Sequence, residues 1–157
     1  MRRWLKAATV AASLVLFGAQ SAVASDTVGW KTVSTNSNWY CGDYVLHPET
    51  WEPGMFGLNF KACTIVNSSG GAQAVLVAQN ANELHLWYMQ KGRVVFESQL
   101  GGDVWCAASN LGQGLTRGCY APTVPVGKCQ RVDAPYVEMT ISGVTKRAYG
   151  RAAYTPC

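Results

Sequence analysis

The chain has 157 residues, of which 13 are Lys or Arg and 9 are Asp or Glu, giving a formal net charge of +4. Three of the basic residues and none of the acidic ones lie in residues 1–24, so the rest of the chain holds ten basic and nine acidic side chains. A chain so close to neutral lacks the basic surface with which proteins bind nucleic acid, and we expect no DNA or RNA partner.

Residues 1–24 have the three parts of a secretory signal peptide. A basic start is followed by an apolar stretch of small residues and by Ala-Val-Ala at positions 22–24, which is a cleavage site. The apolar stretch is too short to span a bilayer, and no later run is long enough, so we expect no transmembrane anchor. The sequence predicts a secreted, extracellular protein in which residues 25–157 form a single domain.

Six cysteines follow the signal peptide, at positions Cys41, Cys63, Cys106, Cys119, Cys129 and Cys157. An even number of cysteines in an exported chain is typical of a disulfide framework, here of three bonds. We favour the sequential pairing 41–63, 106–119 and 129–157, because short loops close at the lowest entropic cost. The chain has no C-x-x-C pair, and His47 and His85 are isolated from one another, so we expect no metal and no cofactor.

The segment before the core is polar with a few spaced apolar residues. Val28, Trp30 and Val33 alternate with polar residues, which predicts an edge strand, although a mobile arm is the alternative. Residues 34–38 are a polar loop, and residues 39–46 resemble a strand held by a cysteine. Residues 47–54 contain two prolines and form a further loop, which carries Trp51 between two glutamates.

The stretch 57–79 is the predicted core of the domain. Residues 57–67 alternate between apolar and polar side chains, as in a half-buried strand. Residues 67–71 supply turn residues, and residues 74–78 form an unbroken apolar run. Such a run predicts a strand buried on both faces in the middle of a sheet.

The second half continues with short strands separated by turns. We predict strands at 84–89, 94–100 and 104–106, a turn at 91–93, a long loop at 109–118, an extended segment at 119–129 and a hairpin over 136–149 with its turn at 142–143. Strands at a spacing of about ten residues with no helical period predict an all-β fold. We expect an antiparallel β-sandwich with three disulfides, with a barrel as the alternative.

No motif of a known catalytic site occurs in the chain. His85 stands between two leucines, which favours a structural histidine over a catalytic base. Glu49 and Glu52 flank Trp51 and could form a glycosidase pair, but acids are common neighbours on a domain surface. We therefore expect no enzyme activity, and a hydrolase is the third-ranked hypothesis.

Two loops are candidate binding sites. Trp51 could stack on a sugar ring or anchor a protein interface. The proline-containing segment between two cysteines is the best interface candidate, since a pre-ordered loop binds at lower entropic cost. Its candidate residues are Tyr120, Pro122, Thr123, Val124, Pro125, Val126 and Lys128. The alternative is a plain crossover between two sheets.

The sequence therefore predicts a secreted, non-enzymatic binding protein. Its expected partner is a secreted or cell-surface protein, which it would bind as an inhibitor or as a component of a secreted, antagonistic or toxin-type assembly. A cell-wall or glycan-binding module is the alternative. The last third of the chain is richer in Lys and Arg. This indicates a solvated face, or one that docks an acidic partner or an anionic cell-wall polymer.

Overall fold

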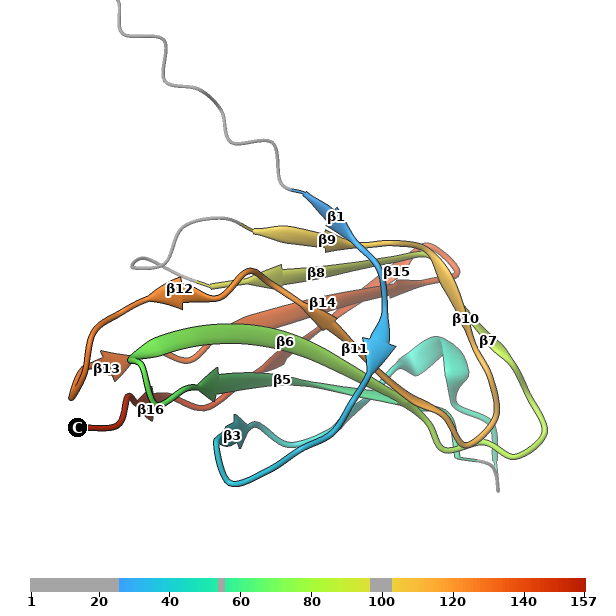
Figure 1. The fold of residues 1–157 in the computed structure, drawn as a ribbon. Coiled ribbons are helices and arrows are strands. Elements are labelled where there is room, and N and C mark those ends of the chain that lie inside the picture. Colours follow the sequence, from blue (N-terminus) through green and yellow to red (C-terminus); the bar gives the residue numbers. More distant parts are fainter. Residues whose placement is uncertain (1–25, 54–55, 97–102) are drawn as a thin grey trace, which may run out of the picture.

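The computed structural model describes residues 26–53, 56–96 and 103–157, and Figure 1 shows their arrangement. The predicted signal peptide lies outside the described residues, as do residues 97–100 of one predicted strand. The strands are β1 (Thr27–Val28), β2 (Lys31–Thr32), β3 (Trp39–Cys41), β4 (Val45–Leu46), β5 (Leu58–Val66), β6 (Gly71–Asn80), β7 (Trp87–Met89), β8 (Lys91–Val95), β9 (Val104–Cys106), β10 (Ser109–Leu111), β11 (Thr116–Tyr120), β12 (Val124–Pro125), β13 (Arg131–Val132), β14 (Tyr136–Ile141), β15 (Val144–Tyr149) and β16 (Ala153–Tyr154). A 3-10 turn, η1 (Pro48–Thr50), lies between β4 and β5.

Two sheets pack face to face. The large sheet has the order β2-β11-β6-β5-β3, with β4 also on β5 and β12 also on β6, and the small sheet has the order β1-β9-β8-β14-β15. Strands β5 and β6 of the large sheet contact β14, β15 and β8 of the small one. Neither order closes on itself, so the predicted sandwich is confirmed, and the strands of residues 26–53, 56–96 and 103–157 form no closed barrel. Among the described residues, all strand pairings are antiparallel except the parallel pair β1–β9.

The β5–β6 hairpin is the centre of the large sheet, as predicted. Leu58 and Phe60 alternate inward with half-buried polar neighbours, and β6 is buried on both faces. Leu76 belongs to the core between the sheets, whereas Val75 and Val77 pack on the opposite face under Trp39 and other half-buried side chains. β6 extends beyond the predicted 74–78 at both ends, because residues 72–80 pair with β5 and Gly71 pairs with Pro125 of β12.

The three disulfides join Cys41 to Cys63, Cys106 to Cys119 and Cys129 to Cys157. The sequential pairing is therefore confirmed. The first bond joins neighbouring strands of the large sheet, β3 and β5, and the second joins β9 of the small sheet to β11 of the large one. The third joins Cys129, two residues before β13, to the segment after β16.

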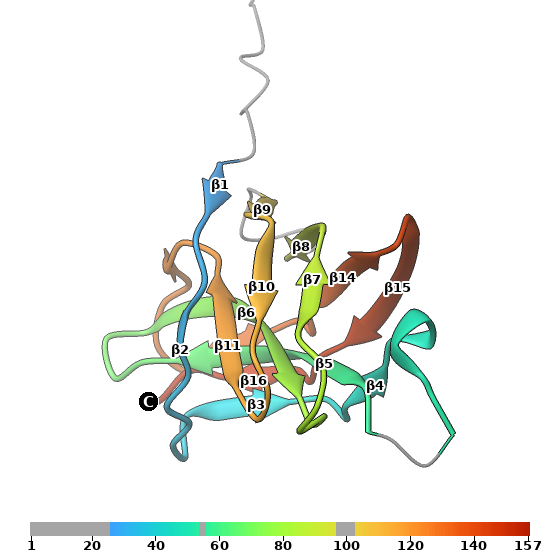
Figure 2. The same ribbon diagram turned by 90° about the vertical axis from the view of Figure 1, so that its right-hand side faces the viewer.

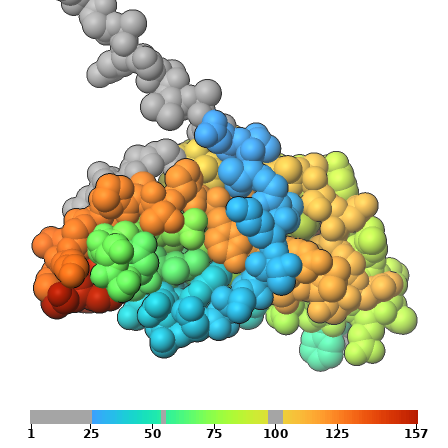
Figure 3. Space-filling view, in the orientation of Figure 1, coloured from blue at the N-terminus to red at the C-terminus, as the bar shows by residue number. Residues whose placement is uncertain are grey.

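The N-terminal strands form sheet edges, so the edge-strand prediction is confirmed. β1 pairs with β9 in the small sheet and β2 pairs with β11 in the large sheet, so one short segment joins both layers. The indole of Trp30 between them donates a hydrogen bond to the carbonyl of Ala107 at 2.7 Å. Figure 3 shows these strands in blue, lying across the surface of the sandwich.

The turn predicted at 91–93 is wrong, because these residues belong to β8. That strand lies between β9 and β14. Gly92 is needed for packing rather than for a turn, since a Cβ there would stand 2.9 Å from the Cβ of Cys106. In the sequence, a glycine between two basic residues indicated a turn. In the structure, Gly92 instead allows β8 to pack closely against Cys106.

The long strand predicted at 84–89 is also wrong, because only β7 (Trp87–Met89) is extended. The side-chain oxygen of Asn82 accepts hydrogen bonds from the N–H groups of Leu84 and His85. Such Asx contacts compete with a strand ladder. The loop predicted at 109–118 is wrong in part, because β10 and β11 occupy most of it and only residues 112–115 turn the chain.

The remaining predictions differ only in detail. The predicted strand 39–46 is divided into β3 and β4 at Gly42, where a Cβ would stand 1.9 Å from the carbonyl oxygen of Tyr149. The predicted loop after it contains η1. The hairpin over 136–149 is confirmed, and its turn uses Ser142 and Gly143 at φ values of 49° and 81°. Both positions have positive φ, as a two-residue type I′ turn requires.

Candidate functional site

One end of the sandwich carries a group of exposed apolar side chains on loops, which we call the apolar loop end. Trp51 is 61% exposed, Phe56 75% and Leu84 71%. Its members are Trp51, Phe56, Leu84, Leu86, Tyr88 and Leu115. They come from the segment after η1, from residues 81–88 and from the turn between β10 and β11. Figure 2 looks onto this end, where β7 and β10 lie side by side and the helical turn η1 lies at the right.

Hydrogen bonds join these loops to one another. The buried Asn80 at the end of β6 donates through its side-chain nitrogen to the carbonyls of His85 and Leu111, at 2.8 and 3.0 Å. Its backbone N–H donates to the carbonyl of Leu115. The side chain of Gln113 donates to the carbonyl of Leu84 at 3.2 Å. The loops that carry Leu84, Leu86 and Leu115 are therefore cross-connected by hydrogen bonds.

The segment that carries Trp51 is attached to the core through His47 and Thr50, both buried. The Nε2 atom of His47 lies 3.2 Å from the carbonyl oxygens of Met139 and Val144, and its Nδ1 accepts a hydrogen bond from the N–H of Glu49. Burial lowers the pKa of His47, although both carbonyls oppose this shift. The neutral tautomer with its proton on Nε2 satisfies all three contacts, so His47 joins η1 to the β14–β15 hairpin.

His85, predicted to be a structural histidine within a strand, lies instead in the exposed turn before β7. Its side chain is 46% exposed, and its Nε2 stands 3.8 Å from a carboxylate oxygen of Glu52. Its ring also lies 5.9 Å from the ring of Trp87. His47 has the structural role that the sequence reasoning assigned to His85. The signal was its position immediately before a proline at a helix start, where a side chain can cap the turn.

The 119–129 segment is bound to the large sheet along much of its length. Val124 and Pro125 pair with the first residues of β6, and the buried Ala121 donates its N–H to the carbonyl of Ala74. Tyr120 is half-buried, with its ring edge-on to that of Trp39 at 6.1 Å. Pro122, Thr123, Pro125 and Lys128 are exposed, and Val124 and Val126 are half-buried. The segment has the contacts of an edge strand of the large sheet.

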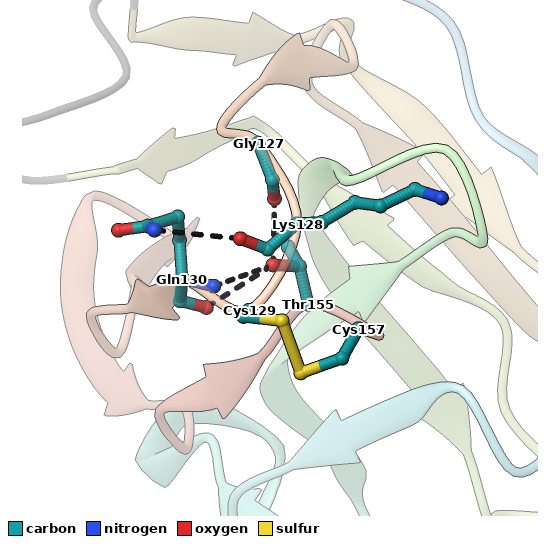
Figure 4. Close-up of a disulfide and its surroundings, with 6 residues drawn as sticks. All are labelled: Gly127, Lys128, Cys129, Gln130, Thr155 and Cys157. Atoms are coloured by element: carbon teal, nitrogen blue, oxygen red, sulfur yellow. Dashed lines mark hydrogen bonds between the residues drawn. A yellow bond between two sulfur atoms is a disulfide. The ribbon is translucent and has the colours of Figure 1, made fainter.

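The end of this segment is held by the buried Thr155 as well as by the disulfide between Cys129 and Cys157. Figure 4 shows the hydroxyl of Thr155 against the carbonyl of Gly127, at 2.6 Å, and against the N–H of Gln130, at 2.9 Å. The side chain of Lys128 points away from this cluster.

The structure places the two predicted binding elements at different ends of the molecule. The segment pairs with Gly71 and Ala72 at the start of β6, whereas Trp51 follows Thr50, whose hydroxyl accepts a hydrogen bond from Leu58 opposite the end of β6. Figure 1 shows β12 on the left and the helical turn η1 on the right. Trp51 and the 119–129 segment therefore do not form one site.

A third surface, which the sequence reasoning missed, is the outer face of the small sheet. It has a shallow hollow of about 130 Å³, lined by Lys91, Gly92, Arg93, Trp105, Glu138, Thr140 and Thr145. Arg93 in β8 stands opposite Trp105 in β9 and opposite Glu138 in β14. Only the cross-strand register brings these residues together, so no motif along the chain could have indicated the hollow.

Within the described part of the chain, no helix is long and apolar enough to cross a membrane. No group of three or more His, Cys, Asp or Glu in that part is placed to hold a metal ion. The three disulfides are compatible with an extracellular protein. No family model, no curated protein and no solved structure matches the chain.

Proposed function

We propose that this chain is an exported, non-enzymatic protein that works by binding another secreted or cell-surface protein, either as an inhibitor or as a component of a secreted assembly. The observation that carries this proposal is the apolar loop end. Large apolar side chains on a small protein are costly to leave in water, and contiguous exposed patches mark interaction sites. Trp and Tyr are also the side chains most enriched among binding hot spots.

The way in which the loops are held supports the same proposal. Asn80, Gln113 and Thr50 bind the loops through hydrogen bonds that do not involve the exposed side chains. A partner would therefore bury the side chains of Trp51, Leu84 and Leu115 on backbone that neighbouring contacts already hold, which lowers the entropic cost of association. Burial of apolar area contributes roughly 25 cal/mol per Å².

A protein partner fits this end better than a glycan does. Sugar hydroxyls need hydrogen-bonding side chains beside the ring on which the sugar stacks. Trp51 shares its end of the molecule with Phe56, Leu84 and Leu86, whose side chains offer no such groups, and the nearby polar side chains of Glu52 and His85 lie 3.8 Å from each other. The 119–129 segment remains a second candidate protein-binding surface, through its exposed prolines and the half-buried Val124.

The test compares retention by immobilised variants of the purified chain without residues 1–24. Culture supernatant and a solubilised cell-surface fraction are passed over the wild type and over Trp51→Ala, Leu84→Ala and Val124→Ala variants. We expect Trp51→Ala and Leu84→Ala each to weaken the retained protein partner by about 1–3 kcal/mol, or roughly 5- to 150-fold. Val124→Ala should leave retention unchanged.

Tyr154→Ala is the matched control, because Tyr154 is a similarly exposed aromatic residue outside the loop end. Trp51→Ala, Leu84→Ala and Tyr154→Ala should keep the wild-type melting temperature, since these side chains lie largely in solvent. Val124 is half-buried, so folding of the Val124→Ala variant is checked by its own melting curve. If only Val124→Ala fails to retain the protein partner, the binding site lies on the 119–129 segment. Retention of the same protein by every variant would refute both site assignments, and retention of polysaccharide in place of protein would refute the function.

A further inference from the structure

The outer face of the small sheet carries polar side chains in register across its strands. Trp105, Arg93, Glu138 and Arg147 stand opposite one another in β9, β8, β14 and β15, and Lys91, Thr140 and Thr145 form the next row. The second row and most of the first line the hollow. An aromatic ring, both signs of charge and two hydroxyls thus converge on one open surface.

The first row is ordered by its own contacts. A carboxylate oxygen of Glu138 accepts from Nε and Nη2 of Arg147, at 3.1 and 2.6 Å, and the other lies 3.9 Å from Nη1 of Arg93. Arg93 also pairs with Asp103. The hydroxyls of Thr140 and Thr145 lie 2.8 Å apart. The donors and acceptors of the hollow are therefore held in place before any ligand arrives.

Lys91 differs from the other cations of this face. Its Nζ lies 3.6 Å from the centre of the Trp105 ring, and Arg93 lies 5.1 Å from the same ring. Arg93 and Arg147 each have a carboxylate partner, whereas Lys91 forms no ion pair among the described residues. The positive charge of Lys91 is thus uncompensated and stands directly over a flat apolar surface.

We propose that this hollow binds one ring of an anionic glycan. The apolar C–H face of a pyranose stacks on the Trp105 ring, from which the Lys91 side chain moves aside. The ammonium of Lys91 then forms an ion pair with the carboxylate or phosphate of the sugar. Thr140, Thr145 and Glu138 are placed to meet the hydroxyls at the ring edge. A volume of about 130 Å³ is well below the roughly 300–1,000 Å³ of enclosed small-molecule sites, which suits a single ring on an open sheet.

This site is independent of the protein-recognition proposal. It lies on the small sheet and uses none of the residues of the apolar loop end. The two proposals therefore fail separately, because a variant at one surface leaves the other intact.

The test is isothermal titration calorimetry of the purified chain without residues 1–24 against four probes. These are tetragalacturonate, the neutral galactose tetrasaccharide, glucose 6-phosphate and inorganic tripolyphosphate. We expect binding of tetragalacturonate, binding about tenfold weaker for the neutral sugar, and none for tripolyphosphate. Binding of glucose 6-phosphate in preference to tetragalacturonate would assign the anion as phosphate, and the reverse order would assign it as uronate.

Two variants assign the residues. Lys91→Gln should weaken the anionic sugar about tenfold and leave the neutral sugar unchanged, because it removes only the charge–charge contact. Trp105→Phe should weaken both sugars by a similar factor. Lys128→Gln is the matched control, with the same change of charge on an exposed lysine outside the hollow. Tripolyphosphate binding as strong as that of the sugars, or equal binding by Lys91→Gln and wild type, would overturn the proposal.

Discussion

The apolar loop end and the hollow on the small sheet are both open to solvent, but they differ in what their side chains already contact. At the loop end, Trp51, Phe56 and Leu84 are mostly exposed. In the hollow, Glu138 is held between Arg93 and Arg147, and its side chain is only 19% exposed. One surface offers apolar area that has no partner, and the other offers polar groups of which all but Lys91 are already paired.

This difference sets what each surface can do. A partner that covers the loop end removes apolar area from water and breaks no existing contact, so it can bind tightly. A ligand in the hollow must compete with internal ion pairs and with water, so the net gain from each contact is small and depends on salt. We therefore expect affinity at the loop end and chemical selectivity at the hollow.

Both surfaces depend on the same core. Leu76 of β6 lies between the sheets, and its Cδ1 atom reaches the inner side of Gly92 in the floor of the hollow. The last residue of β6 is Asn80, which organises the loops. Variants of the core should therefore affect both regions together, whereas variants outside it should separate them.

The largest effect is expected from Leu76→Asp. The variant places an unpaired charge between the sheets, which should cost about 4 kcal/mol or more and exhaust the stability of a marginal domain. Urea unfolding followed by tryptophan fluorescence should show loss of the folded state and of both binding activities. Gln79→Asp, at a half-buried polar position of the same strand, is the control and should still fold. A folded Leu76→Asp variant would show that the two regions do not depend on one core.

A second, intermediate effect should follow from acid, through His47. Burial lowers the pKa of His47 in the folded protein, below its ordinary value of about 6.5. As pH falls below about 6.5, His47 becomes protonated in the unfolded chain but stays neutral in the folded chain, because its pKa is lower there. The free energy of unfolding should then fall by up to about 1.4 kcal/mol per pH unit until the folded pKa is reached.

The measurement is urea unfolding at a series of pH values from 7.5 to 5, with the variant His47→Gln beside the wild type. The variant should lose this part of the pH dependence, because glutamine does not titrate. His85→Gln, at an exposed histidine, should retain it. Because His47 joins η1 to the β14–β15 hairpin, acid should weaken the loop end and the small sheet together. Identical pH profiles for His47→Gln and wild type would disprove this coupling.

The smallest effect is expected from Glu138→Gln. The variant removes the ion pairs to Arg147 and Arg93 but keeps the shape of the side chain, so the loss should be about 1 kcal/mol or less. Because salt screens ion pairs, the difference from wild type should shrink between low and high NaCl in urea titrations. Asp133→Asn, which removes an exposed pair with Arg131, should have no measurable effect. If Glu138→Gln lowered the free energy of unfolding by several kcal/mol, the ion pairs of the hollow would contribute to folding as strongly as the core does.

The parts of the fold that could be predicted from sequence are those where a local pattern decides the structure. The alternation along β5, the apolar run in β6 and the Ser142–Gly143 turn each express one physical rule over consecutive residues. The disulfides were predictable because the cysteines that are neighbours in sequence also belong to neighbouring strands or segments. In each case the short-range signal and the tertiary contacts agree.

The errors arose where particular side-chain contacts, one local and the others between distant segments, decide the structure. Asn82 draws two N–H groups into a turn, which ends the apparent strand before β7. Gly92 is required by Cys106, 14 residues away in sequence. The hollow depends on a register across four strands, and the apolar loop end depends on three loops that meet only after folding. Residue patterns along the chain therefore indicate neither the hollow nor the apolar loop end.

The order of the disulfides also bears on how the protein can be produced. Every bond joins a cysteine to the next one in the chain, so the three covalent rings follow one another without overlap. When a chain enters an oxidising compartment amino end first, each cysteine can react with its correct partner as soon as that partner arrives. An oxidase that simply joins successive thiols would form the native set without later exchange, so disulfide isomerase should be dispensable for this protein.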